Sequence, residues 1–218
     1  MNGSGSLRRC SLLVGLLLAW LVGGGLMSSA GAAEPLVLKA GVDYEPIVPP
    51  VPVTSAKPEV VEVFNFKCPH CEQFHPAMNA WTEKMKARFE IKSLPIAFTN
   101  QSDQPVRAFY AAQFFGREAE MKHALFNAHF ADHVNIDSPQ ELAFLAEGMK
   151  FDAAAFQNHM SSFGVQSKVA QGRAQAQAYG VTGTPTLVIN GRYRVSPGKH
   201  DQGKTERLFA IVETLAAQ

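Results

Sequence analysis

An apolar run that ends in two closely spaced cysteines limits the folds open to this chain. The run, PEVVEVFNF at residues 58–66, is almost continuous in β-branched and aromatic residues, which is typical of a buried central strand. The segment that follows, residues 69–89, repeats apolar residues as one face of a helix does, at Phe74, Met78, Trp81 and Met85. Cys68 and Cys71 are therefore predicted to lie at a strand-to-helix junction.

This junction suits a reactive thiol. Cys68 is expected near the N-cap of the helix and Pro69 at its first position, where the missing N–H costs nothing. A sulfur there lies beside the unpaired amides and the positive end of the helix dipole, which favour its thiolate. Residues three apart on the first turn face the same side, so Cys68 and Cys71 can form a disulfide without large strain.

Two other uses of the cysteines are less favoured. As a structural cross-link the pair would enclose only two residues, and the stabilisation by a disulfide grows with loop length. Zinc would find Cys68, Cys71 and His75, but a structural zinc site usually takes a second cysteine pair, and the sequence offers none. His129 and His133 are expected on a solvated helix face, because no glutamate follows His129 as a metalloprotease motif requires.

The N-terminal segment has the pattern of an export signal. Arg8 and Arg9 precede an apolar run over residues 12–22, and small residues follow at 30–33, so residues 1–33 are predicted to be cleaved off before Ala33 or Glu34. The run is too short to favour a membrane anchor. Cys10 falls in this segment, which leaves Cys68 and Cys71 in the mature protein. Without the two arginines the net charge of +1 becomes −1, so a nucleic acid or an anionic membrane surface is not expected as a partner.

Two motifs together resemble a known family. VEVFNFKCPHCEQFHP resembles the active-site segment of the DsbA family, exported thiol:disulfide oxidoreductases with a thioredoxin fold. YGVTGTPTLVINGRY, residues 179–193, is similar to the cis-proline loop of that family, with Pro185 as the cis-proline. Cys71 and Pro185 lie 114 positions apart, a spacing that matches the insertion of a helical domain in this family. The resemblance extends from about Leu36 to Leu215.

The resemblance implies an α/β thioredoxin-like fold with an inserted all-helical domain. Its domains would be a thioredoxin-like domain formed by residues 34–100 and 180–218, and a helical insertion at residues 101–179. The sequence pattern agrees with this division: it predicts strands at 58–66 and 90–97, helices throughout 104–179, a hairpin around Asn190-Gly191 and a last helix at 202–216. The proline-rich residues 46–52 are expected to form an extended edge segment.

The resemblance also implies a function. A periplasmic member of this family introduces disulfide bonds into exported proteins through a redox-active Cys68–Cys71 disulfide, without a metal or another cofactor. It would act as a monomer on reduced or unfolded exported proteins and be re-oxidised by a quinone-linked membrane protein of the DsbB type. His70 would stabilise the thiolate, Glu62 matches a buried acid that is a candidate proton relay, and Thr184 and Pro185 would bind substrate.

Three departures from the family pattern limit what the resemblance implies, and the third leaves the direction of the reaction open. Lys67 replaces an apolar residue, and its ammonium either assists the thiolate or is simply solvated. The helical segment lacks cysteines for the second disulfide found in several members. Thr184 stands where oxidases often have valine and some isomerases or reductases have threonine. A disulfide isomerase or reductase therefore remains an alternative, although no segment before Pro58 is long enough for a dimerisation domain, and so does a non-enzymatic binding or metal protein.

Overall fold

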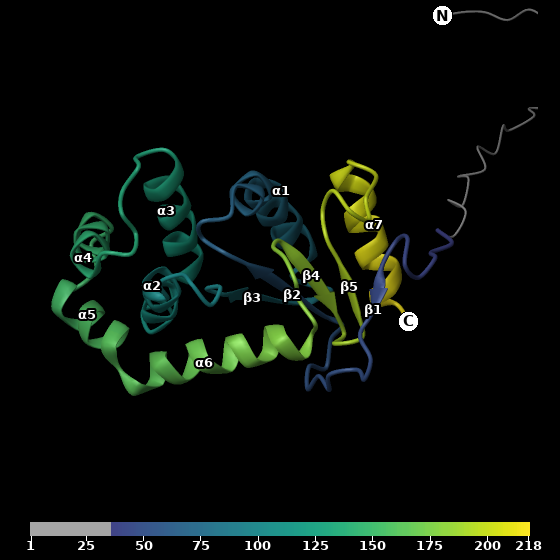
Figure 1. Cartoon of the computed structure of the whole chain (residues 1–218), viewed down its shortest axis with the longest axis horizontal. Coiled ribbons are helices and arrows are strands. Elements are labelled where there is room, and N and C mark those ends of the chain that lie inside the picture. The colour runs from purple at the N-terminus through teal and green to yellow at the C-terminus, as the bar shows by residue number, and fades with distance from the viewer. Residues whose placement is uncertain (1–35) are drawn as a thin grey trace, which may run out of the picture. The chain divides into compact units, whose positions relative to one another are not determined.

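The computed structural model describes residues 36–218, and the predicted export signal with Cys10 lies outside this part of the chain. Within residues 36–218, five strands form one mixed sheet in the order β1-β5-β4-β2-β3 (Figure 1). Only β2 and β3 run parallel to each other, and the other neighbours are antiparallel. The strands are β1 (Glu45–Pro46), β2 (Glu59–Phe64), β3 (Glu90–Pro95), β4 (Thr186–Ile189) and β5 (Tyr193–Val195).

Strand β2 is the buried central strand that the apolar run predicts. All six of its residues are buried, and it lies between β3 and β4, with Val60 opposite Ile91 on one side and Ile189 on the other. Because β2 and β3 are parallel, the chain needs a crossover between them, and helix α1 (Pro69–Met85) supplies it. The start of α1 is thereby fixed at the end of the central strand.

Helices cover both faces of the sheet (Figure 1). Helices α1 and α7 (Thr205–Ala216) pack on one face, where their apolar side chains meet Leu187 and Ile189 of β4. Helix α6 (Phe163–Ala178) covers the opposite face, where Val188 packs with residues from β2, β3 and the end of this helix. Successive residues of β4 thus alternate between two cores, as the pleat of a strand requires.

The predicted helical insertion lies between β3 and β4. It contains α2 (Gln104–Gln113), α3 (Glu118–Phe130), α4 (Pro139–Gly148), α5 (Ala153–Ser161) and α6. Phe64, the last residue of β2, and Phe66 just after it pack into the core of these helices. Both rings contact Phe109 and Phe126. The aromatic end of the strand therefore fixes the helices beside the cysteine pair.

Two local predictions have opposite outcomes. The hairpin between β4 and β5 is confirmed: Asn190 and Gly191 both have positive φ, 51° and 61°, as a two-residue type I′ turn requires. The shared helix face of His129 and His133 is wrong, because α3 ends at Phe130 and His133 lies in the following loop with φ 54°. Within the described residues, none of the helices has the length and apolar character needed to span a membrane.

Candidate active site

Asn65 holds the loop between β2 and α1 in place. Its side chain donates to the Ile96 carbonyl at 2.8 Å and accepts the Lys67 amide at 2.8 Å, and its own carbonyl accepts the Cys68 amide at 3.1 Å. Only 4% of Asn65 is exposed. Asn65 was not found from the sequence, although a polar side chain between the two phenylalanines at the end of the apolar run was a visible signal.

Cys68 occupies the N-cap of α1 and Pro69 its first turn, as predicted. The Cys68 carbonyl accepts the amides of Cys71 and Glu72 at 3.0 and 3.2 Å, which begins the helix. Both cysteines are free thiols; Cys68 is half-buried, whereas 1% of Cys71 is exposed. The outer sulfur is therefore the one that a partner protein can reach.

The loop before β4 faces the outer sulfur. The Thr184–Pro185 peptide bond is cis, in agreement with the sequence analysis. The Cys68 thiol donates to the Thr184 carbonyl at 3.3 Å, so residues 116 positions apart meet at the site. Beside them lies an open cleft of about 370 Å³ that His70 and Phe74 line together with Thr184, Pro185 and several residues of the 197–205 segment.

The two thiols differ in their surroundings. Burial raises the pKa of the Cys71 thiol to about 12, contacts with Asn65 and Thr184 oppose this rise, and neighbouring Cys68 adds to it. Cys71 therefore stays protonated near neutral pH. Cys68, half-buried at the start of α1, is the more accessible of the two thiols.

His70 is exposed and lines the same cleft as Thr184 and Pro185. Among the described residues it has no hydrogen bond to either cysteine. The structure therefore brings His70 to the site without fixing its contact with the sulfur.

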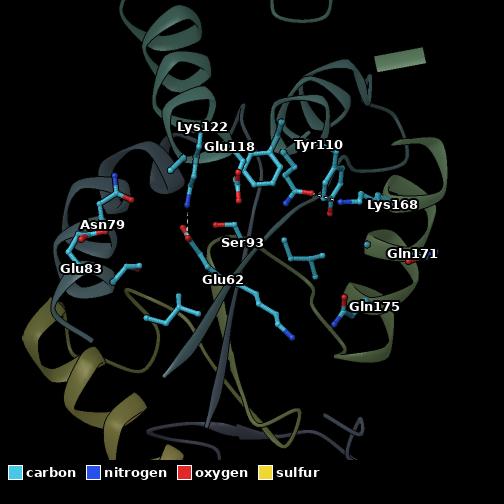
Figure 2. Close-up of a pocket in the computed structure, with 18 residues that line it drawn as sticks. Glu62, Asn79, Glu83, Ser93, Tyr110, Glu118, Lys122, Lys168, Gln171 and Gln175 are labelled. Carbon is cyan, nitrogen blue, oxygen red and sulfur yellow. Dashed lines mark hydrogen bonds and ion pairs between the residues drawn. The ribbon is translucent and has the colours of Figure 1, made fainter. Parts of the chain in front are cut away.

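Among the described residues, no hydrogen bond or ion pair joins Glu62 to either cysteine. Its carboxylate accepts a hydrogen bond from Lys122 of α3 at 2.5 Å, and the two side chains are 4% and 5% exposed. Figure 2 shows this pair at the wall of a cavity of about 650 Å³ between β2, β3 and helices α1, α2, α3 and α6. Lys122 also lies over the Phe64 ring, 4.1 Å from its centre. No pattern in the sequence points to Lys122 as the partner, since it is 60 residues away.

Lys67 forms an ion pair with Asp137, which lies in the loop between α3 and α4. The question of whether its ammonium is free to assist Cys68 therefore has a structural answer: a carboxylate from the helical insertion neutralises it. Asp137, like Lys122, was not found from the sequence.

His75, considered above as a third zinc ligand, lies inside the protein instead. Its Nε2 is 3.1 Å from the Asn79 amide nitrogen, and its ring packs against Phe126. Burial lowers the pKa of His75 to about 4, with smaller effects from Lys122 and His123. Within residues 36–218, no three side chains of His, Cys, Asp or Glu are grouped to hold a metal ion.

Fold and site together define a class of protein. A cysteine pair with one accessible and one buried thiol begins a helix after the central strand of a mixed sheet, and a cis-proline loop lies against the accessible sulfur. This arrangement is that of a thioredoxin-like thiol:disulfide oxidoreductase, in which a thiolate exchanges with disulfides.

Comparison with known proteins identifies the family. Residues 59–210 match the model of the DSBA-like thioredoxin domain. The thiol:disulfide interchange protein DsbA of Pseudomonas aeruginosa is 33% identical over 184 residues, which cover 84% of this chain and 86% of that protein. The DsbA of Azotobacter vinelandii is 31% identical over 208 residues, 95% of this chain and 96% of that protein.

A solved structure agrees. The crystal structure of Pseudomonas aeruginosa DsbA superposes with a TM-score of 0.75 at 32% identity, covering 83% of this chain and 93% of that one. The chain therefore belongs to the DSBA-like thioredoxin domain family and is a thiol:disulfide oxidoreductase. The predicted fold class, a thioredoxin-like fold with an inserted helical domain, is confirmed.

Proposed function

We propose that this protein oxidises the cysteines of exported proteins, and that Cys68 is its reacting sulfur. The observation that carries the proposal is the geometry of the pair: the Cys68 thiol is accessible at the start of α1 and 3.3 Å from the Thr184 carbonyl, while Cys71 is buried. An extended substrate that enters the cleft at the Thr184–Pro185 loop can pair with the loop backbone next to Cys68.

The proposed reaction transfers two electrons from the substrate to the enzyme. A substrate thiolate attacks Cys68 of the Cys68–Cys71 disulfide, and Cys71 leaves and takes up a proton. A second substrate thiolate attacks the substrate sulfur of the mixed disulfide and releases Cys68 as a thiolate. The substrate then holds a new disulfide and the enzyme a dithiol. A stabilised Cys68 thiolate is a good leaving group, which makes the enzyme a stronger oxidant.

The remaining site residues take supporting roles in this proposal. Pro69 starts the helix whose dipole stabilises the thiolate, and His70 adds positive charge or a hydrogen bond at the rim of the cleft. Thr184 and Pro185 form the surface from which the oxidised substrate dissociates. Glu62 is a proton relay for Cys71, a role supported by its burial in β2, the strand that leads to the cysteine pair.

We further propose that the chain works as a monomer in the periplasm after removal of residues 1–33. No cofactor beyond the cysteine couple is needed for the exchange. A membrane protein of the DsbB type, linked to quinone, would return the dithiol to the disulfide. The division into a domain of residues 34–100 and 180–218 and an insertion of residues 101–179 belongs to the same proposal.

Trapping tests the roles of the two cysteines. The Cys71→Ala protein, converted to a glutathione mixed disulfide at Cys68, should exchange with a reduced substrate that has a single cysteine and hold it, because the resolving thiol is missing. Cys68→Ala treated in the same way should trap little, since Cys71 is buried. Gel electrophoresis without reductant measures the trapped complex. More trapping by Cys68→Ala would show that the assignment is reversed.

The alternative direction, isomerase or reductase, is favoured by one observation. Threonine precedes the proline at the loop whose carbonyl contacts Cys68. The reduction potential separates the two directions, because an oxidase lies well above thioredoxin on the scale of potentials. Equilibration of the purified protein with glutathione buffers gives this value, and a thioredoxin-like potential would establish the reductase.

A further inference from the structure

A second pocket lies on the other side of the Thr184 loop. Its volume is about 240 Å³, and every residue that lines it is polar or charged apart from a single glycine. Its basic side chains are Arg194, Lys199 and His200, and its one acidic side chain is Glu45. Thr184 lines both this pocket and the cleft beside the cysteines. We call it the Arg194 pocket.

Hydrogen bonds fix the wall of the Arg194 pocket. The Thr186 hydroxyl donates to the Gly183 carbonyl at 2.8 Å and lies 3.0 Å from the Ser196 hydroxyl. A hydroxyl has one hydrogen, which Thr186 donates to the Gly183 carbonyl. The Thr186 hydroxyl therefore accepts a hydrogen bond from the Ser196 hydroxyl. The loop that carries Thr184 is thereby tied to the segment after β5, and the pocket keeps its shape before a ligand arrives.

His200 presents a buried donor at this pocket. Its Nδ1 accepts the Ser196 amide at 2.9 Å, so in the neutral ring the proton is on Nε2. Only 3% of His200 is exposed, and its Nε2 has no hydrogen-bond partner among residues 36–218. The Glu45 carboxylate is 3.9 Å away, beyond hydrogen-bonding distance. Buried donors are normally paired, so an acceptor is missing here.

Arg194 is held in place with donors to spare. One of its terminal nitrogens donates to the Tyr179 carbonyl at 2.9 Å. Gly180 makes room for it: a Cβ at this position, where φ is +65°, would lie 2.4 Å from the same nitrogen. A guanidinium has five N–H groups, and within the described residues that of Arg194 forms no other hydrogen bond.

The pocket has an excess of positive charge. Lys199 binds Glu45 at 3.0 Å, and this contact lowers the pKa of the Glu45 carboxyl, so that the two charges cancel. With His200 neutral, the charge of Arg194 remains uncompensated. Outside the pocket the balance is different, because the chain without residues 1–33 has a net charge of −1. The attraction for an anion is therefore local to this pocket.

We propose that the Arg194 pocket binds a carboxylate side chain of the reduced substrate, near the cysteine that is being oxidised. The proposal rests on the function proposed above. An extended chain advances about 3.3 Å per residue, so a substrate that pairs with residues 182–184 reaches the pocket within two or three residues of its cysteine. An Asp or Glu at that position accepts hydrogen bonds from Arg194 and meets the unpaired donor of His200.

Paired peptides test this specificity. Each peptide has two cysteines and an amidated C-terminus, and the members of a pair differ only by Asp or Asn at one position within three residues of a cysteine. The rate constant with which the oxidised enzyme oxidises each peptide is measured, and the Asp/Asn ratio is compared between enzyme variants. The comparison uses the same peptides throughout, because an Asp also changes the reactivity of its own neighbouring cysteine.

We expect the Asp/Asn ratio of the wild type to exceed that of Arg194→Gln by about two- to fivefold at one position, the range for a partly exposed charge pair. Arg192→Gln, the same change on an exposed arginine outside the pocket, should keep the wild-type ratio. Lys199→Gln provides an independent variant: its side chain is 62% exposed, and its loss leaves Glu45 unpaired in the pocket, so the ratio should fall.

Three results would contradict the assignment of the Arg194 pocket, each for a different reason. Equal ratios in the wild type, Arg194→Gln and Lys199→Gln at every position would overturn the pocket assignment while leaving the oxidase function intact. An equal fall in Arg192→Gln would mean that general charge, and not the pocket, attracts the peptide. If the wild type oxidises neither member of any pair, the oxidase function is wrong and the pocket assignment falls with it.

Discussion

Two ion pairs join the sheet side of the active site to the helical insertion, and they differ in how much water reaches them. Glu62 of β2 and Lys122 of α3 are 4% and 5% exposed. Lys67, next to the reacting cysteine, and Asp137 are 24% and 33% exposed. Both pairs link an acid to a lysine across a similar stretch of chain, 60 and 70 residues.

The difference in burial changes what each pair can do. Inside the protein neither charge can be left alone, because an unpaired buried ion costs several kcal/mol, so Glu62 and Lys122 depend on each other. Water screens the partly exposed Lys67 and Asp137, which we call the rim pair, so this ion pair contributes little to stability. The rim pair can instead adjust the field at the sulfur of Cys68, one residue from Lys67. Loss of one partner should therefore destabilise the fold in the first case and change the reactivity of Cys68 in the second.

The buried pair gives the largest expected effect. Lys122→Met should lower the free energy of unfolding by about 3–5 kcal/mol, because Glu62 is left as an uncompensated buried carboxylate. Urea unfolding near neutral pH measures this. Lys168→Met is the matched control, since Lys168 is an exposed lysine at the same cavity, where it donates to Gln113 at 2.6 Å. Its effect should stay within about 0.5 kcal/mol.

A double variant separates charge from packing. Glu62→Leu combined with Lys122→Met leaves no unpaired charge, so most of the lost stability should return. If the double variant is as unstable as Lys122→Met alone, the loss comes from packing around Phe64, over which the ammonium lies.

His75 reports on the interior from a second position, beside Lys122. Its pKa in the folded protein is about 4, lowered first by burial and then by Lys122, whereas its ordinary value is 6.5. Below pH 6.5, His75 of the unfolded chain therefore binds a proton, whereas His75 of the folded protein stays neutral down to about pH 4. The free energy of unfolding falls as the pH drops from about 6.5 to about 4. The loss should approach about 3 kcal/mol.

Two variants check this assignment by urea unfolding at several pH values. His75→Leu removes the titrating group, so its stability should fall less than that of the wild type over this range. His133→Asn changes an exposed histidine and should follow the wild-type curve. If His75→Leu keeps the full pH dependence, other groups are responsible, and the half-buried His129, whose pKa is also lowered by burial, would be tested next.

The sequence was most informative where a short segment determines its own structure. The apolar run, the proline after Cys68 and the Asn190-Gly191 turn each have a local physical reason, and the structure has all three. The family motifs extended this to Pro185, 114 residues from Cys71. Residues 104–179 could be recognised as helical, but the packing of these helices could not be predicted. An amphipathic pattern does not show which helix its apolar face packs against.

The partners of the charged residues were beyond reach for the same reason. Lys122 and Asp137 lie in α3 and the loop after it, and only tertiary packing brings them to Glu62 and Lys67. The prediction that His129 and His133 share a helix face failed for a different reason. A spacing of four residues fits a helix, but it does not show where the helix ends, which is at Phe130. Helix ends depend on caps, and no strong cap residue marked this one.

The smallest effect is expected at the rim, where it should appear in reactivity. Asp137→Asn leaves the Lys67 ammonium uncompensated beside Cys68, so the thiolate fraction of Cys68 at a given pH should rise. Lys67→Met leaves the Asp137 carboxylate uncompensated, so that fraction should fall. Each free-energy change should be below about 1 kcal/mol, which is less than about fivefold in the thiolate equilibrium.

In the Lys67→Met/Asp137→Asn double variant both charges are gone, and the wild-type titration should return. Thiolate absorbance against pH measures all four proteins, and urea unfolding should show changes below about 1 kcal/mol in each. Shifts of the same sign in the two single variants would mean that the loop moves when either partner is lost. The rim pair would then act by holding the loop after Asn65 in place, as the buried pair holds its neighbours, and the contrast between the two pairs would disappear.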